Sequence, residues 1–161
     1  MNKETLLKMG AHEEIERRFL LRRTDTLKNL INIQIISVSQ YYTSEGRIRC
    51  CDNGNASRIY YLTIKLDNGY GNNLEYEEEI DSHRFNTLKE TSTKSIHKTR
   101  YVYFENDLKW EIDKFEDPHI GILEVELTHI EQDIKIPDFL QDLILFEITG
   151  DKRFSNYNLA K

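Results

Sequence analysis

Apolar and polar side chains alternate along most of this chain, which is the pattern of β-strands with one apolar face. Leu62 and Ile64 share one face of such a strand and Lys65 lies on the other, while Val125 is separated in the same way from Glu124. Segments of this kind, bounded by turn residues, predict eight strands over about 12–22, 33–43, 45–51, 57–66, 72–80, 95–105, 108–116 and 120–130.

Helical signals are fewer and shorter. Asp81-Ser82 predicts the start of a helix over 82–91, because an aspartate before the first turn accepts hydrogen bonds from free backbone N–H groups. Phe85 and Leu88 would form its inner face. Further short helical pieces are expected over 24–31, 137–145 and 154–160. We expect residues 1–11 to form an N-terminal leader and residues 12–161 to form a single domain.

The ionisable faces of the strands are segregated by sign. In a β-sandwich these faces would contact water, and each would be expected to mix both signs. Segregation favours instead a mainly β, eight-stranded antiparallel β-barrel whose interior is charged and whose apolar exterior is covered by short helices. The carboxylate pairs are Glu14 and Glu16, Glu75 and Glu77, and Glu124 and Glu126; the cation pairs are Arg47 and Arg49, and Lys98 and Arg100.

Composition agrees with a polar interior. The 161 residues are 39% hydrophobic and 31% charged, with a net charge of −6 that argues against a surface coating nucleic acid. No apolar run approaches the roughly 18 residues of a membrane span. The only cysteines, Cys50 and Cys51, are adjacent, and an adjacent pair rarely forms a structural disulfide. A reducing, cytoplasmic setting is therefore expected.

The spacing of the charges indicates a chemistry. Two carboxylates two residues apart on a strand lie about 7 Å from each other and repel by roughly 2 kcal/mol in a partly enclosed site. Carboxylate oxygens are the ligands that hard divalent cations prefer, and arginine and lysine bind phosphate oxygens. Acidic and basic strands in one small barrel predict a site for a metal–polyphosphate complex.

The run Glu14-Ile15-Glu16-Arg17-Arg18 resembles the E-x-E-x-K signature of the CYTH domain, or triphosphate tunnel metalloenzyme, superfamily. The agreement continues in order over about residues 12–160, through Arg47-Ile48-Arg49, Tyr61 to Lys65, Glu75-Tyr76-Glu77, Lys98 to Tyr101, Trp110 to Asp113, Glu124 to Leu127 and Thr149 to Phe154. The resemblance implies an eight-stranded barrel tunnel that acts on triphosphate groups with Mg²⁺ or Mn²⁺.

The resemblance also implies roles for individual residues. The metal ligands would be Glu14, Glu16, Glu75, Glu77, Asp113, Glu124 and Glu126. The phosphate-binding cations would be Arg18, Arg47, Arg49, Lys65, Lys98, Arg100 and Arg153. Lys98, Arg100 and Glu126 would be catalytic.

Two positions depart from the family pattern. Arg18 stands where the motif has lysine, which keeps the charge but replaces an ammonium by a planar fork. Asn73 stands where many relatives carry an arginine, so one phosphate subsite would be weaker or altered. By position, Glu78 and Glu111 are expected at the surface and Lys152 is expected to face away from the site.

Three functions remain open at this point. The resemblance favours a triphosphatase that acts on inorganic tripolyphosphate, since no segment indicates an adenine pocket. The alternatives are a class IV adenylate cyclase that makes cyclic AMP from ATP, and a polyphosphate- or nucleotide-binding module without turnover. The expected partner is a small triphosphate-containing molecule, with no nucleic acid and no membrane; a homodimer would cover part of an apolar exterior.

Overall fold

The computed structural model describes residues 1–22, 24–25, 27, 31–55 and 57–161. The strands are β1 (His12–Leu21), β2 (Gln34–Tyr42), β3 (Arg47–Asp52), β4 (Ile59–Asp67), β5 (Asn72–Ile80), β6 (Lys94–Glu105), β7 (Leu108–Phe115), β8 (Ile120–Leu127) and β9 (Ile144–Glu147). The helices are α1 (Lys3–Lys8), α2 (Ser82–Lys89), α3 (Asp138–Gln141), the 3-10 helix η2 (Lys152–Phe154) and α4 (Asn156–Leu159).

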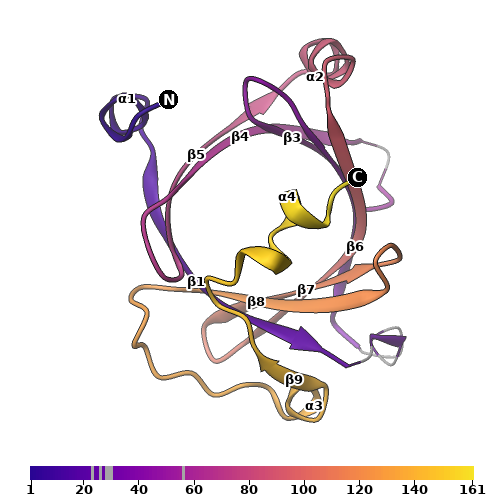
Figure 1. The fold of residues 1–161 in the computed structure, drawn as a ribbon. Coiled ribbons are helices and arrows are strands. Elements are labelled where there is room, and N and C mark those ends of the chain that lie inside the picture. The colour runs from indigo at the N-terminus through magenta and orange to yellow at the C-terminus, as the bar shows by residue number, and fades with distance from the viewer. Residues whose placement is uncertain (23, 26, 28–30, 56) are drawn as a thin grey trace.

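Eight strands form a closed antiparallel barrel, as the segregated charges predicted (Figure 1). The order around the barrel is β5-β4-β3-β2-β6-β7-β8-β1, and β1 closes the ring by pairing with β5 as well as with β8. In β1, residues 12–15 pair with β5 and residues 15–21 pair with β8. The short β9 pairs with β1 at residues 19–21, beyond the point where β5 leaves it.

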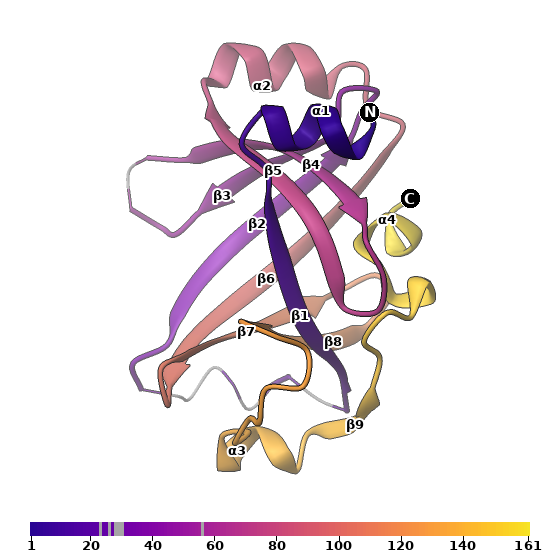
Figure 2. The same ribbon diagram turned by 90° about the vertical axis from the view of Figure 1, so that its left-hand side faces the viewer.

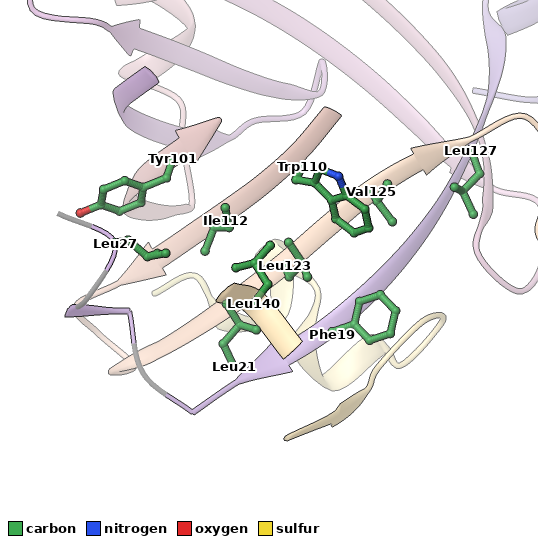
Figure 3. Packing of buried hydrophobic residues seen from close by; sticks show 10 residues of the cluster. All are labelled: Phe19, Leu21, Leu27, Tyr101, Trp110, Ile112, Leu123, Val125, Leu127 and Leu140. Atoms are coloured by element: carbon green, nitrogen blue, oxygen red, sulfur yellow. The ribbon is translucent and has the colours of Figure 1, made fainter. Parts of the chain in front are cut away.

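The apolar outer faces of the strands are covered by two sets of short elements. Around Trp110, the outer faces of β6, β7, β8 and β1 form one buried cluster, against which Leu140 of α3 packs (Figure 3). The outer faces of β3 and β4 form a second cluster with Phe85 and Leu88 of α2. The predicted arrangement of an apolar exterior under short helices is therefore confirmed.

The helix α2 begins where the sequence predicted. The Asp81 side chain accepts a hydrogen bond of 2.7 Å from the backbone N–H of Arg84, which satisfies one of the free donors of the first turn. Phe85 and Leu88 are 4% and 7% exposed, so the inner face is also as expected. Figure 2 shows α2 lying along the outside of the strands.

The other helical expectations are met only in part, since α3 and α4 form within the expected segments but are shorter than them. The expected helix over 137–145 is limited to α3, because the chain from Ile144 extends to pair with β1 as β9. The C-terminal piece is split into η2 and α4. Half of the residues in 24–31 lie outside the described part of the chain. In the expected leader, α1 forms and buries Leu6. Among the described residues, no helix is long and apolar enough to cross a membrane.

Candidate functional site

A charged cavity of about 890 Å³ lies inside the barrel and receives side chains from every barrel strand. The strand alternation explains its lining, because every second residue of a strand points inward. The structure brings the following predicted site residues together in the cavity wall: Glu14, Glu16, Arg18, Arg47, Arg49, Lys65, Glu75, Glu77, Arg100, Glu124 and Glu126.

One part of the wall is a group of carboxylates around Lys65. The Lys65 ammonium donates a hydrogen bond to Glu14 and lies 3.8 Å from a carboxylate oxygen of Glu16 and 3.7 Å from one of Glu75. Burial and the neighbouring Glu124 carboxylate raise the pKa of Glu16 to about 7. This region therefore holds more negative charge than its single ammonium neutralises, and it can accept a further cation.

A basic part of the wall comes from β3. The Arg49 guanidinium lies 2.5 Å from Glu77, whereas the Arg47 guanidinium lies only 3.9 Å from Glu75 and 4.0 Å from Glu77. In the described structure the Nε atoms of both arginines are buried without a hydrogen-bond partner. Burial and the charge of Arg49 lower the pKa of Arg47. Buried donors without acceptors are costly, so this site suits an anion with several oxygens.

Behind this wall lies a buried ion network centred on Asp113. One Asp113 oxygen accepts from Lys98 at 2.5 Å and from Arg100 at 2.8 Å, and the other accepts from Arg100 at 2.7 Å. Arg100 also donates to Glu111 and, at 3.1 Å, to Glu124. Burial, together with Arg100, lowers the pKa of Lys98 to about 8 even though Asp113 opposes the shift.

The positions of Lys98 and Asp113 differ from those of the other predicted site residues. Both are buried and neither lines the cavity, whereas Arg100, which donates to Asp113, does line it. Both oxygens of Asp113 already accept from cations. Despite complete burial, these two cations hold the pKa of Asp113 below its usual range. Their roles toward metal and phosphate stay predictions.

Two further predicted residues lie at the edge of the site or beyond it. Glu126 lines the cavity but is exposed, and its Cα atom faces that of Glu16 across the β1–β8 pair. The Arg153 side chain is 81% exposed, forms an ion pair with Asp151 and does not line the cavity. The predicted binding of phosphate by Arg153 would need its side chain to turn inward.

The cavity wall also contains residues that were not predicted from the sequence. Glu111, expected at the surface, lines it and bonds to Arg100, and Lys109 lies beside it. Lys109 and Glu111 alternate with the buried Trp110 and so share a strand face with Asp113. This alternation is the signal that could have identified them as cavity residues. Lys152, expected to face away, lines the cavity and pairs with Asp67. Its place depends on the C-terminal fold, which alternation does not predict.

The donor set fits a hard divalent cation. Across the described residues, no three carboxylate, imidazole or thiol groups gather closely enough to hold a metal ion by themselves. The carboxylates are instead interleaved with cations, and the Lys65 ammonium lies among three of them. Carboxylate oxygens that already surround the Lys65 ammonium could also bind Mg²⁺ or Mn²⁺, which prefer oxygen ligands.

Comparisons with known proteins show similarity to inorganic triphosphatases. The chain is 35% identical over 105 residues to the inorganic triphosphatase of Acetivibrio thermocellus, and the match covers 63% of this chain and 65% of that protein, just under two thirds of its length. No protein-family profile matches the chain.

Solved structures show the same fold. The inorganic triphosphatase NE1496, whose crystal structure is known, shares 26% sequence identity with this chain. The two structures superpose with a TM-score of 0.55, and the match covers 91% of this chain and 96% of that one. A putative adenylyl cyclase from Hippeastrum, described as having a dominant triphosphatase activity, is 19% identical. Its TM-score is 0.52 over 73% of this chain and 81% of that one, a likeness of fold alone.

Proposed function

We propose that this chain is a divalent-metal-dependent triphosphatase of the CYTH, or triphosphate tunnel metalloenzyme, superfamily; its likeness in sequence and fold to inorganic triphosphatases supports the proposal. Its substrate would be inorganic tripolyphosphate, hydrolysed to pyrophosphate and phosphate inside the barrel. The observation that carries the proposal is the division of the cavity into an acidic group around Lys65 and a basic group at Arg47 and Arg49, in which the Arg47 guanidinium lies 3.9 and 4.0 Å from Glu75 and Glu77.

The basic group would bind the phosphate chain. Arg47 and Arg49 present guanidinium forks, which match two phosphate oxygens at once, and Lys65 adds a point charge. The loose pairing of Arg47 leaves it free to exchange distant carboxylates for phosphate oxygens at little cost. Asn73 in the cavity wall contributes an amide rather than a charge.

The acidic group would hold the metal. Glu14, Glu16, Glu124 and Glu126 are the proposed ligands, with Glu75 and Glu77 nearby. A bound Mg²⁺ or Mn²⁺ would neutralise charge on the phosphate oxygens and lower the pKa of a coordinated water. Lys65 would then move from the carboxylates toward phosphate, because its ammonium and the metal compete for the same oxygens.

Hydrolysis would proceed by attack of water on the terminal phosphorus. The water oxygen forms the new P–O bond, the bridging P–O bond breaks, and pyrophosphate leaves with the bridging oxygen. One proton of the water stays on the released phosphate and the other passes to solvent. Arg100, which lines the cavity, would stabilise the charge that builds on this leaving group. Lys98 and Asp113 would fix the guanidinium of Arg100 from behind.

A paired incubation with tripolyphosphate and with ATP tests the proposal. Each substrate is supplied with Mg²⁺, with Mn²⁺ or with EDTA, and phosphate, pyrophosphate and cyclic AMP are all quantified. We expect metal-dependent phosphate release from tripolyphosphate and no cyclic AMP. Cyclic AMP with an equal amount of pyrophosphate would establish a cyclase instead, and tight binding without turnover would establish a binding module.

The cytoplasmic setting, the single domain over 12–161 and the homodimer also stay predictions. Light scattering on the purified chain measures its mass in solution. A mass of twice 19.2 kDa would support the homodimer, and a mass of 19.2 kDa would contradict it.

A further inference from the structure

The C-terminal segment, residues 149–161, forms one wall of the cavity. Figure 1 shows η2 and α4 lying across the ring of strands, and Figure 2 places them at one end of the barrel. Ser155, Tyr157 and Asn158 line the cavity. Ala160 is buried in a cluster with Ile96, Phe115, Ile122 and Ile148. The segment is therefore packed against the barrel and contributes to the site.

The far end of this segment is held by β6. The backbones of Ser95 and Lys161 exchange two hydrogen bonds, of 2.7 and 3.1 Å. The Lys94 ammonium lies 4.4 Å from the centre of the Tyr157 ring, and Tyr42 packs edge-on against the same ring. These contacts fix α4 but leave η2 to be held by other residues.

The near end is held by Arg18 of β1. The Arg18 backbone N–H donates to the Thr149 hydroxyl at 2.9 Å, and its carbonyl accepts from the Ile148 N–H at 2.8 Å. The Arg18 side chain, in a residue only 8% exposed, donates from Nε to Glu124 at 3.0 Å and from Nη2 to the Phe154 carbonyl at 3.1 Å. One guanidinium thus joins a carboxylate of β8 to the backbone of η2.

This double contact depends on the departure from the family motif. A lysine at this position would present one ammonium nitrogen, a compact point charge without a planar fork. Such a group can remain beside Glu124, but it does not hold the carboxylate and the Phe154 carbonyl in one fixed geometry. The planar fork of Arg18 presents two separate nitrogens to these two acceptors.

We infer that Arg18 is a positioning residue that fixes the C-terminal segment against Glu124 and so sets the shape of the cavity wall that the substrate meets. The anchoring itself is independent of the reaction. The consequence for substrate rests on the proposed function, because it requires tripolyphosphate to bind against this wall.

Arg18→Lys, which restores the residue of the motif, tests the anchoring, and Arg17→Lys is the matched control. Arg17 is the next residue, and it forms a two-pronged pair with Glu147 of β9, with bonds of 2.9 and 2.8 Å. Arg17 does not line the cavity.

Hydrogen exchange is measured on metal-free, substrate-free protein. The amides of Phe154 and Ser155, which close η2, should exchange about tenfold faster in Arg18→Lys and at the wild-type rate in Arg17→Lys. Unchanged exchange in Arg18→Lys would overturn the inference.

Kinetics with tripolyphosphate separate positioning from direct contact with the reacting groups. We expect Arg18→Lys to raise KM about fivefold and to change kcat little, because the wall is loosened while the charge is kept. A lowered kcat with unchanged KM would place Arg18 on the reacting groups instead.

A double-mutant cycle with Tyr157→Ala gives the second readout. Since both substitutions act through the position of the same segment, their combined effect on KM should not exceed the larger single effect. Additive effects would contradict the inference. A wild-type protein without triphosphatase activity would contradict the proposed function, while the exchange comparison would still decide whether Arg18 anchors the segment.

Discussion

At the scale of single residues, some carboxylates of the site are fully paired with cations and others are not. Asp113 is fully buried between Lys98 and Arg100, whereas Glu16 is partly buried, lies near the Glu124 carboxylate and is 3.8 Å from the Lys65 ammonium. The first arrangement stabilises a charged carboxylate and the second disfavours one. The pKa values shift accordingly in opposite directions, downward for Asp113 and upward for Glu16.

The raised pKa of Glu16 predicts a pH dependence of stability in the metal-free protein. Between the ordinary value of 4.5 and about 7, the folded state keeps a proton that the unfolded state has lost. The free energy of unfolding should therefore fall as pH rises through this range, by up to about 3 kcal/mol. Urea unfolding of wild type and Glu16→Gln at pH 4.5 and pH 8 measures this. The loss should disappear in the variant; an equal loss in both proteins would contradict the assignment.

Removal of the Glu126 carboxylate, at the exposed edge of the cavity, should abolish most turnover without unfolding the protein. Glu126→Gln should reduce turnover about a hundredfold, because an amide binds a divalent cation much more weakly than a carboxylate does. The thermal midpoint should stay close to that of wild type, since the Glu126 side chain is exposed. Phosphate release is compared with that of Glu131→Gln, an exposed position outside the cavity wall. Normal turnover in Glu126→Gln would exclude it as a metal ligand.

At the scale of elements, the helices α2 and α3 each cover an apolar strand face that would otherwise meet water. The contact of α2 with β3 and β4 depends on Phe85 and Leu88, and on the cap that starts the helix at Asp81. This cover lies outside the barrel, on the face opposite the charged cavity. Changes in α2 should therefore affect stability and leave the chemistry of the site intact.

Asp81→Ala tests this separation. Loss of the hydrogen bond to the Arg84 N–H should lower the free energy of unfolding by about 1 kcal/mol. Asp81→Asn, which keeps an acceptor at the cap, should lose much less. Urea unfolding gives the stability and phosphate release gives the turnover of both variants. A substantial fall in turnover at a temperature where Asp81→Ala is fully folded would show that α2 acts on the site.

At the scale of the whole molecule, the acidic group lies where the barrel closes. Strand β1 is the seam, since it pairs with β5 through residues 12–15 and with β8 through residues 15–21. Glu14 and Glu16 come from the seam, Glu75 from one side of it and Glu124 from the other. A cation bound there would join three strands that are distant in sequence.

Metal binding should accordingly stabilise the entire fold. Mn²⁺ at about a hundred times its dissociation constant should add about 2.7 kcal/mol to the free energy of unfolding, and EDTA should remove the gain. A variant with both Glu14→Gln and Glu16→Gln should gain much less. Thermal unfolding with and without the metal measures both. An equal gain in the two proteins would place the bound metal elsewhere.

The sequence by itself determined the strands, the inward face of each and the segregation of charge, because side-chain alternation is a local property of an extended chain. It therefore predicted the barrel, the carboxylate and arginine pairs that line the cavity, and the cap of α2, while the resemblance to the family added Arg18 and Lys65. Alternation shows to which face of a strand a side chain belongs, but it does not show how deeply that side chain is buried or which residue it pairs with. Only the tertiary structure decided that Lys98 and Asp113 lie behind the wall, that Glu111 lines it and that Arg153 does not. It also decided where β9 and the C-terminal segment lie, because both depend on contacts with β1 and β6, which are distant in sequence.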